Sequence, residues 1–253
     1  MIDILNQRSK VIVAGHRGMK AIYPENTLLS FKKAIELGVD MLEFDLNITS
    51  DKHIVVIHDN MVDRTTNGTG YVHDYTLKQL KELDAGSKFG VEFKDLKIPT
   101  FDEFCDLIRP YPRLLLNVEI KEKTQETVDL TMDMLQRYGY LNRCVFTCFD
   151  AAIVRYMVDR YSVKTQGFLS WKMKNFIEGE NGTYSKIYAI GIDMQSLTPE
   201  LVQEFEEKNI LPWCYCPDDD EQVHKALICK ARLITTNNPE CAIRILRERS
   251  NNK

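Results

Sequence analysis

The chain has 253 residues, of which 44% are hydrophobic and 28% are charged. This composition is typical of a folded globular protein, and it excludes a disordered chain, a collagen-like repeat and a small disulfide scaffold. The 33 basic and 37 acidic residues give a formal net charge of −4, and no run of basic residues is longer than two. The sequence therefore does not indicate a nucleic acid or an anionic membrane surface as a partner.

Two further features bear on where the protein acts. No apolar run approaches the roughly 18 residues that a membrane-spanning helix needs, and the first seven residues carry no secretion signal. We therefore expect a cytoplasmic protein without a transmembrane segment.

The seven cysteines are an odd number spread over the chain, which indicates reduced thiols. The spacing of Cys214 and Cys216 lacks the second matching pair of a zinc site. The sequence does not decide between a monomer and a homo-oligomer.

Short apolar strands alternate with amphipathic helical stretches, a pattern typical of βα units around a parallel sheet. Helix starts are marked by Asn26, which can cap a helix that stops at Gly38, and by Thr198 followed by Pro199. The predicted strands cover residues 11–15, 41–47, 113–119, 143–147, 163–168, 187–192, 210–215 and 231–235. Eight such units in about 250 residues predict a (β/α)8 TIM barrel, although a doubly wound open sheet would give a similar linear pattern.

An additional strand is predicted at residues 53–58, directly after the 41–47 strand. The link between the two is too short for a crossover helix, so we expect an antiparallel hairpin. A turn at the centre of this link places His58 opposite Asp45, to within one residue.

Residues 60–110 also depart from the regular alternation. They are rich in Gly, Thr, Asp and Lys, and they contain capping-box patterns that begin at Thr76 and Thr100. We expect them to form a small inserted subdomain on the rim of a single barrel domain that spans residues 1–253.

Polar side chains follow the predicted strands at the ends where a barrel keeps its active site. His16 and Arg17 come directly after the first strand, and they can supply an acid/base group and a cation for an anionic substrate, or they can be an ordinary loop histidine and surface arginine. Glu43 and Asp45 share one face of their strand. Two like charges there need a compensating cation unless the face is exposed to solvent, and Mg²⁺ or Ca²⁺ accepts such oxygen ligands.

Three more groups fall at strand ends. Glu119 and Lys121 share a strand face with Asn117, so that Glu119 can complete a three-carboxylate metal site and Lys121 can neutralise an oxyanion, or the two can form an ordinary solvent-facing pair. His58 lies across the predicted hairpin from the first two carboxylates. Trp213 ends a late strand and can form either an apolar wall for a ligand or part of the core.

These residues and their surroundings resemble the glycerophosphodiester phosphodiesterase family. The motifs that carry the resemblance are HRG at 16–18, PENT at 24–27, Glu43-x-Asp45, VVIHD at 55–59, DRTTNGTG at 63–70, LDAG at 83–86, IPT at 98–100 and VEIK at 118–121. Their order and spacing are highly specific, and the resemblance is strongest over residues 11–121.

The resemblance implies a TIM barrel that hydrolyses glycerophosphodiesters, such as glycerophosphocholine or glycerophosphoethanolamine, to sn-glycerol 3-phosphate and an alcohol. The implied roles are metal binding by Glu43, Asp45 and Glu119, acid/base catalysis by His16 and His58, and phosphate binding by Arg17 and Lys121. The attacking group is then water or the substrate's own glycerol hydroxyl, and the latter would give a cyclic phosphate that water opens.

The C-terminal half departs from the family pattern at residues 213–216 and 235–239, which face the alcohol portion of the substrate in the family. Two alternatives to the leading function therefore remain open. A lysophospholipase D would need an apolar channel at the barrel mouth, for which Phe168, Trp171, Met173 and Phe176 are candidates. A non-catalytic binding barrel is disfavoured because the catalytic set is complete.

Overall fold

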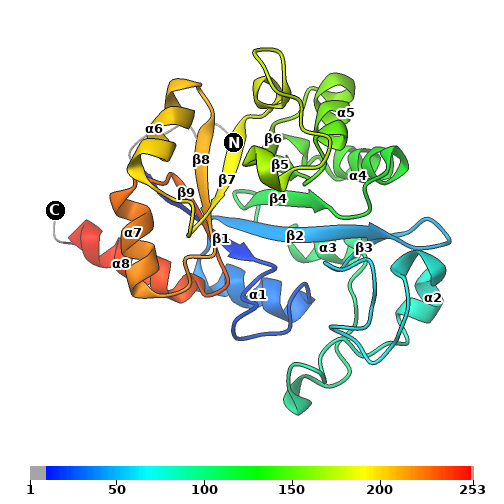
Figure 1. Ribbon diagram of the computed structural model, residues 1–253. Coiled ribbons are helices and arrows are strands. Elements are labelled where there is room, and N and C mark those ends of the chain that lie inside the picture. Colours follow the sequence, from blue (N-terminus) through cyan, green and yellow to red (C-terminus); the bar gives the residue numbers. More distant parts are fainter. Residues whose placement is uncertain (1–9, 252–253) are drawn as a thin grey trace.

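Eight parallel strands close into a barrel in the computed structural model, which describes residues 10–251 (Figure 1). The barrel strands are β1 (Ile12–His16), β2 (Met41–Ile48), β4 (Leu115–Ile120), β5 (Cys144–Thr147), β6 (Thr165–Phe168), β7 (Ala189–Asp193), β8 (Leu211–Tyr215) and β9 (Leu233–Thr236). β1 pairs in parallel with both β2 and β9, and these two pairings close the sheet. The predicted barrel is confirmed, and the open-sheet alternative is wrong.

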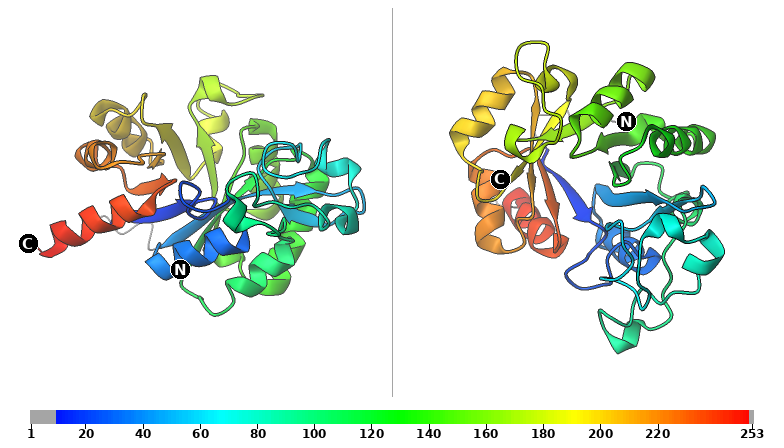
Figure 2. Two further views of the ribbon diagram at one scale, coloured as in Figure 1. Left: turned by 90° about the horizontal axis from the view of Figure 1, so that it is seen from below. Right: turned by 45° about the vertical axis from the view of Figure 1, so that its right-hand side comes forward.

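Helices cover the outside of this barrel (Figures 1 and 2). They are α1 (Leu28–Leu37), α3 (Phe101–Leu107), α4 (Gln125–Tyr138), α5 (Ala151–Tyr161), α6 (Pro199–Glu207), α7 (Asp220–Ile228) and α8 (Pro239–Asn251). Short 3-10 turns occur at Val72–Asp74, Val91–Phe93, Leu141–Arg143, Ser170–Lys172 and Thr183–Lys186. The β1–β9 pairing brings the two ends of the described chain to adjacent sectors of the barrel.

The start of α1 differs from the prediction. Thr27, and not Asn26, caps this helix, and its side-chain oxygen accepts a hydrogen bond from the Ser30 backbone N–H. Asn26 instead has a positive φ of 56° and donates its side-chain amide to Asp45. The expected stop at Gly38 is confirmed, since this residue is left-handed with φ 97°. The cap at Thr198 with Pro at the first helical position is also confirmed.

The core has two layers. A small cluster fills the barrel interior and consists of Ile12, Ala14, Met41, Leu115, Val145, Ala189, Trp213 and Leu233. A much larger cluster lies between the strands and the surrounding helices. All eight residues of β2 are buried, because β4 pairs along one edge of this strand, while β1 and then β3 pair along the other. Polar side chains on β2 are thus withdrawn from water.

β3 (Ile54–Val56) runs antiparallel to β2, as the short link between them predicts. Leu46 pairs with Val56, and the Ile57 backbone N–H donates to the Asp45 carbonyl at 3.0 Å. Ile57 therefore lies opposite Asp45, one residue before His58 and within the predicted tolerance.

The segment between β3 and α3 forms a small lobe beside the barrel rim, drawn in cyan to blue-green in Figure 1. It contains α2 (Leu77–Leu80), and both α2 and α3 begin with the predicted capping boxes, at Thr76 and Thr100. The lobe has its own apolar cluster, which includes Val62, Val72 and Leu80.

Residues 1–9, on which the absence of a secretion signal was predicted, lie outside the described residues. Over residues 10–251, no helix combines the length and the hydropathy that a bilayer crossing requires. The seven cysteines are all free thiols.

Candidate active site

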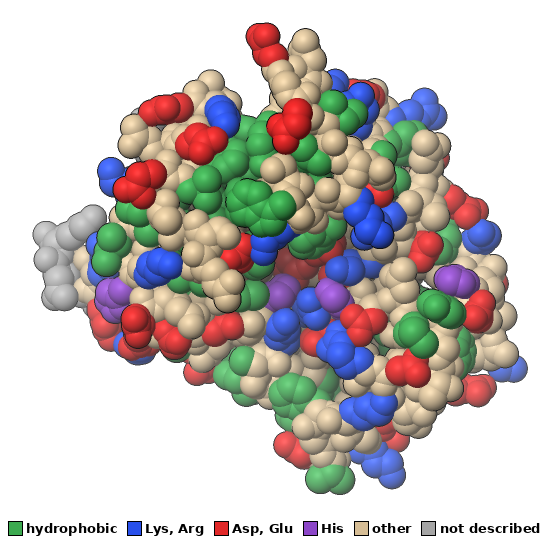
Figure 3. All heavy atoms as spheres, viewed as in Figure 1, with side chains coloured by type: hydrophobic (Ala, Val, Ile, Leu, Met, Phe, Trp, Pro, Cys, Tyr) green, Lys and Arg blue, Asp and Glu red, His purple; other side chains and the backbone are tan. Residues whose placement is uncertain are grey.

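A cavity of about 170 Å³ opens at the carboxyl ends of the barrel strands. Figure 3 shows this recess near the centre of the face, with acidic side chains at its floor and histidine and basic side chains around it. Its lining includes five of the eight predicted site residues: His16, Arg17, Glu43, His58 and Glu119. Of the other three, Asp45 and Lys121 contact members of this set, whereas Trp213 lies elsewhere.

Three carboxylates meet beneath the cavity. Glu43 and Asp45 project from the same face of β2, and Glu119 lies on β4 in register with Asp45. One oxygen of each carboxylate lies within 4.8 Å of the other two, and the three residues are at most 8% exposed. In the described part of the chain, no other group of acidic, histidine or cysteine side chains gathers in this way.

The electrostatics of this cluster favour a bound cation. Burial, together with the charges of Asp45 and Glu119, raises the pKa of Glu43 well above its usual range. Burial also raises the pKa of Glu119. Glu43 Oε1 and Asp45 Oδ1 are buried and accept no hydrogen bond. Free oxygen lone pairs on converging carboxylates are the donor set of a hard divalent cation, so these residues fit Mg²⁺ or Ca²⁺.

Asp45 differs from its two neighbours because positive groups surround it. Burial opposes its ionisation, but Arg17, His58 and Lys121 hold its pKa below the usual value. Arg17 Nε lies 3.2 Å from Asp45 Oδ2, and Asn26 donates to the same oxygen at 2.8 Å. Asp45 is therefore ionised in the metal-free protein.

His16 ends β1 and lies at the edge of the carboxylate cluster. Its Nδ1 is 2.5 Å from Asn237 Oδ1, and its Nε2 is 3.7 Å from Glu43 Oε2. Burial, followed by the charges of Arg17 and Lys20, lowers the pKa of His16 to about 3. A neutral ring in this position can accept a proton at Nε2.

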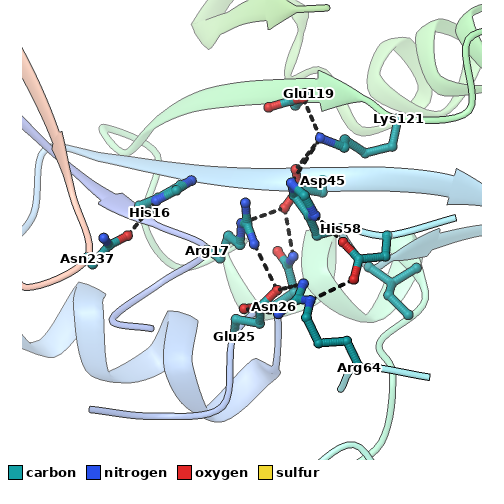
Figure 4. Close-up of polar contacts among 12 residues, drawn as sticks. His16, Arg17, Glu25, Asn26, Asp45, His58, Arg64, Glu119, Lys121 and Asn237 are labelled. Carbon is teal, nitrogen blue, oxygen red and sulfur yellow. Dashed lines mark hydrogen bonds and ion pairs between the residues drawn. The ribbon is translucent and has the colours of Figure 1, made fainter. Parts of the chain in front are cut away.

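His58 faces His16 across the cavity, just beyond β3. Its Nδ1 is 2.5 Å from Asp59 Oδ1, and its Nε2 is 3.0 Å from Lys121 Nζ. Lys121 also donates to Glu119 at 2.7 Å. Each histidine thus has Nδ1 bound to an oxygen acceptor, and Nε2 lies on the side of the carboxylates (Figure 4).

A tight turn after β1 places Arg17. Gly18 has φ 86°, and a Cβ at this position would lie 2.3 Å from Ser30 Oγ, so only glycine fits the turn. The Arg17 backbone N–H donates to Glu43 Oε2 at 3.0 Å, while its guanidinium donates to Glu25 Oε1 at 2.9 Å. The guanidinium is thereby held beside the carboxylates.

Sequence analysis did not identify four residues that complete this network. Arg64 donates to both oxygens of Glu25 and to Asp59, at 2.6 to 2.9 Å. Burial opposes the ionisation of Glu25, but the hydrogen bonds and charges of Arg64 and Arg17 lower its pKa to about 2. Glu25 and Asn26 belong to the PENT motif and Arg64 to DRTTNGTG, so the motifs contain the signal. Asn237 stands after the last strand, in a segment that departs from the family pattern.

Aromatic side chains form the opposite wall of the cavity. Phe149 and Phe168 stack, and Tyr215 packs edge-on against Phe168 with ring centroids 5.9 Å apart. Trp213 is only 1% exposed, and its indole N–H donates to Thr235 at 2.6 Å in the barrel interior. Tyr215 and Cys216, two and three residues further along, line the cavity in its place.

The residues considered for an apolar lipid channel are dispersed. Phe168 lines the cavity, Met173 is buried in the core, and Trp171 is 71% exposed. Phe176 packs against Tyr184. These four side chains do not share one groove, and the lysophospholipase D alternative gains no support from them.

Comparisons with known proteins agree with this site. A sequence profile of the glycerophosphoryl diester phosphodiesterase family matches residues 16–241. A glycerophosphodiester phosphodiesterase of Caldanaerobacter subterraneus is 32% identical over 249 residues, which cover 94% of this chain and 99% of that protein. One from Bacillus subtilis is 26% identical, over 91% of this chain and 85% of that protein.

Solved structures show the same fold. A phosphodiesterase of Oleispira antarctica, determined with the product sn-glycerol-3-phosphate, has a TM-score of 0.83 at 22% identity, with 93% of this chain and 96% of that chain covered. A glycerophosphodiester phosphodiesterase of Agrobacterium tumefaciens has a TM-score of 0.80 at 20% identity, with 92% of this chain and 99% of that chain covered. Given the profile match, the Caldanaerobacter relative and the barrel, the chain belongs to the glycerophosphoryl diester phosphodiesterase family.

Proposed function

We propose that the protein hydrolyses glycerophosphodiesters to sn-glycerol 3-phosphate and an alcohol, with one Mg²⁺ or Ca²⁺ ion bound by Glu43, Asp45 and Glu119. The observation that carries this proposal is the meeting of these three buried carboxylates with two histidines at a single cavity. Family membership supports the reaction class, and the product bound to the Oleispira relative has the matching chemistry.

The cation supplies charge neutralisation at the phosphoryl oxygens when it is bound. Arg17 and Lys121 are placed beside the same carboxylates, so their positive charges can stabilise the charge that develops on the phosphoryl group. Both side chains are mostly buried, at 11% and 15% exposed. Their attraction for an anion is therefore less screened than it would be in water.

The two histidines provide the proton transfers. One Nε2 accepts the proton of the attacking oxygen while that oxygen forms a bond to phosphorus. The bond from phosphorus to the leaving oxygen breaks, and the Nε2–H of the other histidine protonates this oxygen to give the free alcohol. The attacking oxygen belongs to water or, in a two-step route, to the glycerol of the substrate, and water then opens the cyclic phosphate.

The size and composition of the cavity support a small, water-soluble diester. A space of about 170 Å³ with a stacked aromatic pair on one wall suits the apolar edge of a short polyol chain. This part of the proposal distinguishes glycerophosphocholine and glycerophosphoethanolamine from lysolipids.

The test measures sn-glycerol 3-phosphate release from both diesters after treatment with a chelator, with Mg²⁺, Ca²⁺ or Mn²⁺ restored one at a time. Lysophosphatidylcholine serves as the comparison substrate. We expect no release without an ion and restored release on the water-soluble diesters. His16→Ala and His58→Ala should abolish turnover, whereas His73→Ala, which changes a half-exposed histidine that stacks on Tyr71, should not. Activity on lysophosphatidylcholine alone, or on none of the substrates, would overturn the proposal.

A further inference from the structure

Asn237 joins the two ends of the described chain at the active site. It follows β9, which pairs with β1, and Gly15 and Thr236 lie in register in that pairing. This closure places the Asn237 side chain beside His16, with Oδ1 at 2.5 Å from Nδ1 (Figure 4). On its other side, Asn237 Nδ2 donates to Asp218 Oδ2 at 2.5 Å.

Asp218 is itself held in place by two further donors. The Asn237 backbone N–H donates to Asp218 Oδ1 at 2.8 Å, and Thr236 Oγ1 donates to the same oxygen at 2.9 Å. The carboxylate therefore receives three hydrogen bonds from two consecutive residues. Asp218 thus has a fixed position relative to the end of β9.

Asp218, Asn237 and His16 form a row of hydrogen-bonded side chains. The donor or acceptor role of each contacting atom in this row follows from its chemistry. The Asp218 carboxylate oxygens accept hydrogen bonds, so the side of the Asn237 amide that faces Asp218 is its NH₂ group. The amide oxygen consequently faces His16, and an oxygen there can only accept. His16 must therefore carry its proton on Nδ1, which leaves the Nε2 lone pair directed toward Glu43.

From this row of contacts we propose that Asp218 and Asn237 are positioning residues that fix the tautomer and the ring orientation of His16. The inference rests on the proposed function for its catalytic meaning, since it explains how His16 presents Nε2 to a substrate. Histidine tautomers are commonly set by the acceptor at the second ring nitrogen.

The second histidine of the site is held differently. His58 contacts the Asp59 carboxylate directly, whereas an amide stands between His16 and its carboxylate. The amide orients the ring without placing another negative charge beside Glu43, which burial and two carboxylates already disfavour in its ionised form. Cys216 Sγ lies 3.7 Å from His16 Nδ1, and a thiol is a weaker acceptor than the amide oxygen.

Kinetic measurements on single variants test the proposal. Asn237→Leu keeps a similar volume but removes the acceptor, and Asp218→Asn removes the group that forces the amide orientation. We expect kcat to fall by about 10- to 100-fold in Asn237→Leu, with KM changed less than about twofold, because the substrate contacts remain. Gln203→Leu is the matched control, since it removes an exposed side-chain amide on α6 that donates to Glu207 and contacts no residue of the site. Unchanged kcat in Asn237→Leu would overturn the proposal.

A double variant separates positioning from a merely structural role. Combining Asp218→Asn with Asn237→Asp exchanges the donor and the acceptor, so the row again ends in an oxygen at His16. We expect the double variant to recover part of the kcat lost in Asp218→Asn, because the acceptor at His16 is restored while a negative charge now lies beside Glu43. A double variant no more active than its weaker parent would contradict the assignment.

The nitrogen NMR spectrum of His16 gives a readout that needs no turnover. In the metal-free wild type we expect a single neutral tautomer with hydrogen on Nδ1, and in Asn237→Leu a mixture of both tautomers. If the wild type shows this tautomer but does not cleave the diesters, the proposed function fails while the positioning role stands. A wild-type ring with its proton on Nε2 would overturn the inference directly.

Discussion

Replacing Glu43 by Gln tests the carboxylate cluster because the metal-free and the metal-bound protein should respond in opposite directions. Gln keeps the size of the side chain and can still accept the hydrogen bond from the Arg17 backbone N–H, but it removes the charge. In the metal-free protein, this charge is buried beside Asp45 and Glu119. Because Glu43→Gln removes this buried charge, the free energy of unfolding of the metal-free variant should exceed that of the wild type by about 1 to 3 kcal/mol. This is the range for a buried polar group without its full set of partners.

A bound ion should make the wild type more stable than Glu43→Gln. An ion present at about 100 times its dissociation constant should stabilise the wild type by about 2.7 kcal/mol. For a chain of this size, that corresponds to a rise in Tm of roughly 5 to 11 °C. Glu43→Gln removes one of three charged ligands, so most of this rise should disappear. Thermal unfolding followed by circular dichroism, with chelator and with Mg²⁺ or Ca²⁺, gives both comparisons.

The pH dependence of the metal-free protein provides a second check with a fixed sign. The folded-state pKa of Glu43 is raised above its unfolded value, so the folded state binds the proton more tightly. The side chain therefore carries no penalty below the unfolded pKa of about 4.3, and the penalty develops as pH rises through the folded value. The stability gained by Glu43→Gln should grow over that interval.

The matched control is Glu126→Gln, which removes a half-exposed carboxylate in a surface ion pair with Lys52. It should change stability by no more than about 1 kcal/mol and leave the response to the ion intact. If metal-free Glu43→Gln is less stable than the wild type at neutral pH, or if the ion stabilises both proteins equally, the reasoning about this cluster is refuted.

Four further substitutions test other parts of the structure. Thr27→Ala should cost about 1 kcal/mol of stability through loss of the α1 cap, whereas Asn26→Ala should chiefly weaken ion binding, and unfolding and ion titration separate the two. Arg64→Met should lower kcat by about tenfold with little change in KM, because Asp59 loses the partner that holds it against the His58 ring; an unchanged kcat in steady-state kinetics would contradict this. Trp213→Phe should lower stability by about 1 to 3 kcal/mol without altering KM, and a raised KM would return this residue to the substrate site.

Local patterns predicted the eight barrel strands, because each is a short apolar run set between helical stretches. They left a closed barrel and an open sheet as alternatives, and the family resemblance favoured the barrel. They also predicted the hairpin register to within one residue, since the short link after β2 leaves few ways to turn. Glu43, Asp45 and Glu119 could be grouped because alternation along a strand decides which side chains share a face. The carboxylate cluster was thus predictable from three strand positions and the order of their strands.

The position of Trp213 was not predictable in the same way. Residues 213 and 215 share one face of β8, so alternation assigns both to the barrel interior. Their height along the barrel axis separates them, because Trp213 lies level with Leu233 in the closed core while Tyr215 reaches the cavity. Height depends on how neighbouring strands are staggered, which no single strand reveals.

The prediction that Asn26 caps α1 was wrong for a related reason. Asn and Thr are both good capping residues, and the choice between them depends on backbone dihedrals. Thr27 has the extended conformation of a cap, with φ −97° and ψ 155°, while the positive φ of Asn26 turns its side chain away from the helix. The amide thereby released binds Asp45. A residue that sequence analysis assigned to helix capping therefore contacts the carboxylate cluster of the candidate site.

The two histidines are positioned by different parts of the fold. His58 is held by Asp59, its neighbour in sequence, whereas His16 is held by Asn237, which is 221 positions away along the chain. The second contact exists only when β9 has paired with β1 and the barrel has closed. Damage to the C-terminal βα unit should therefore impair the orientation of His16 while the carboxylates on β2 and β4 still bind their ion. Ion binding and turnover are expected to separate in variants of that unit, which lies outside the segment where the family motifs are strongest.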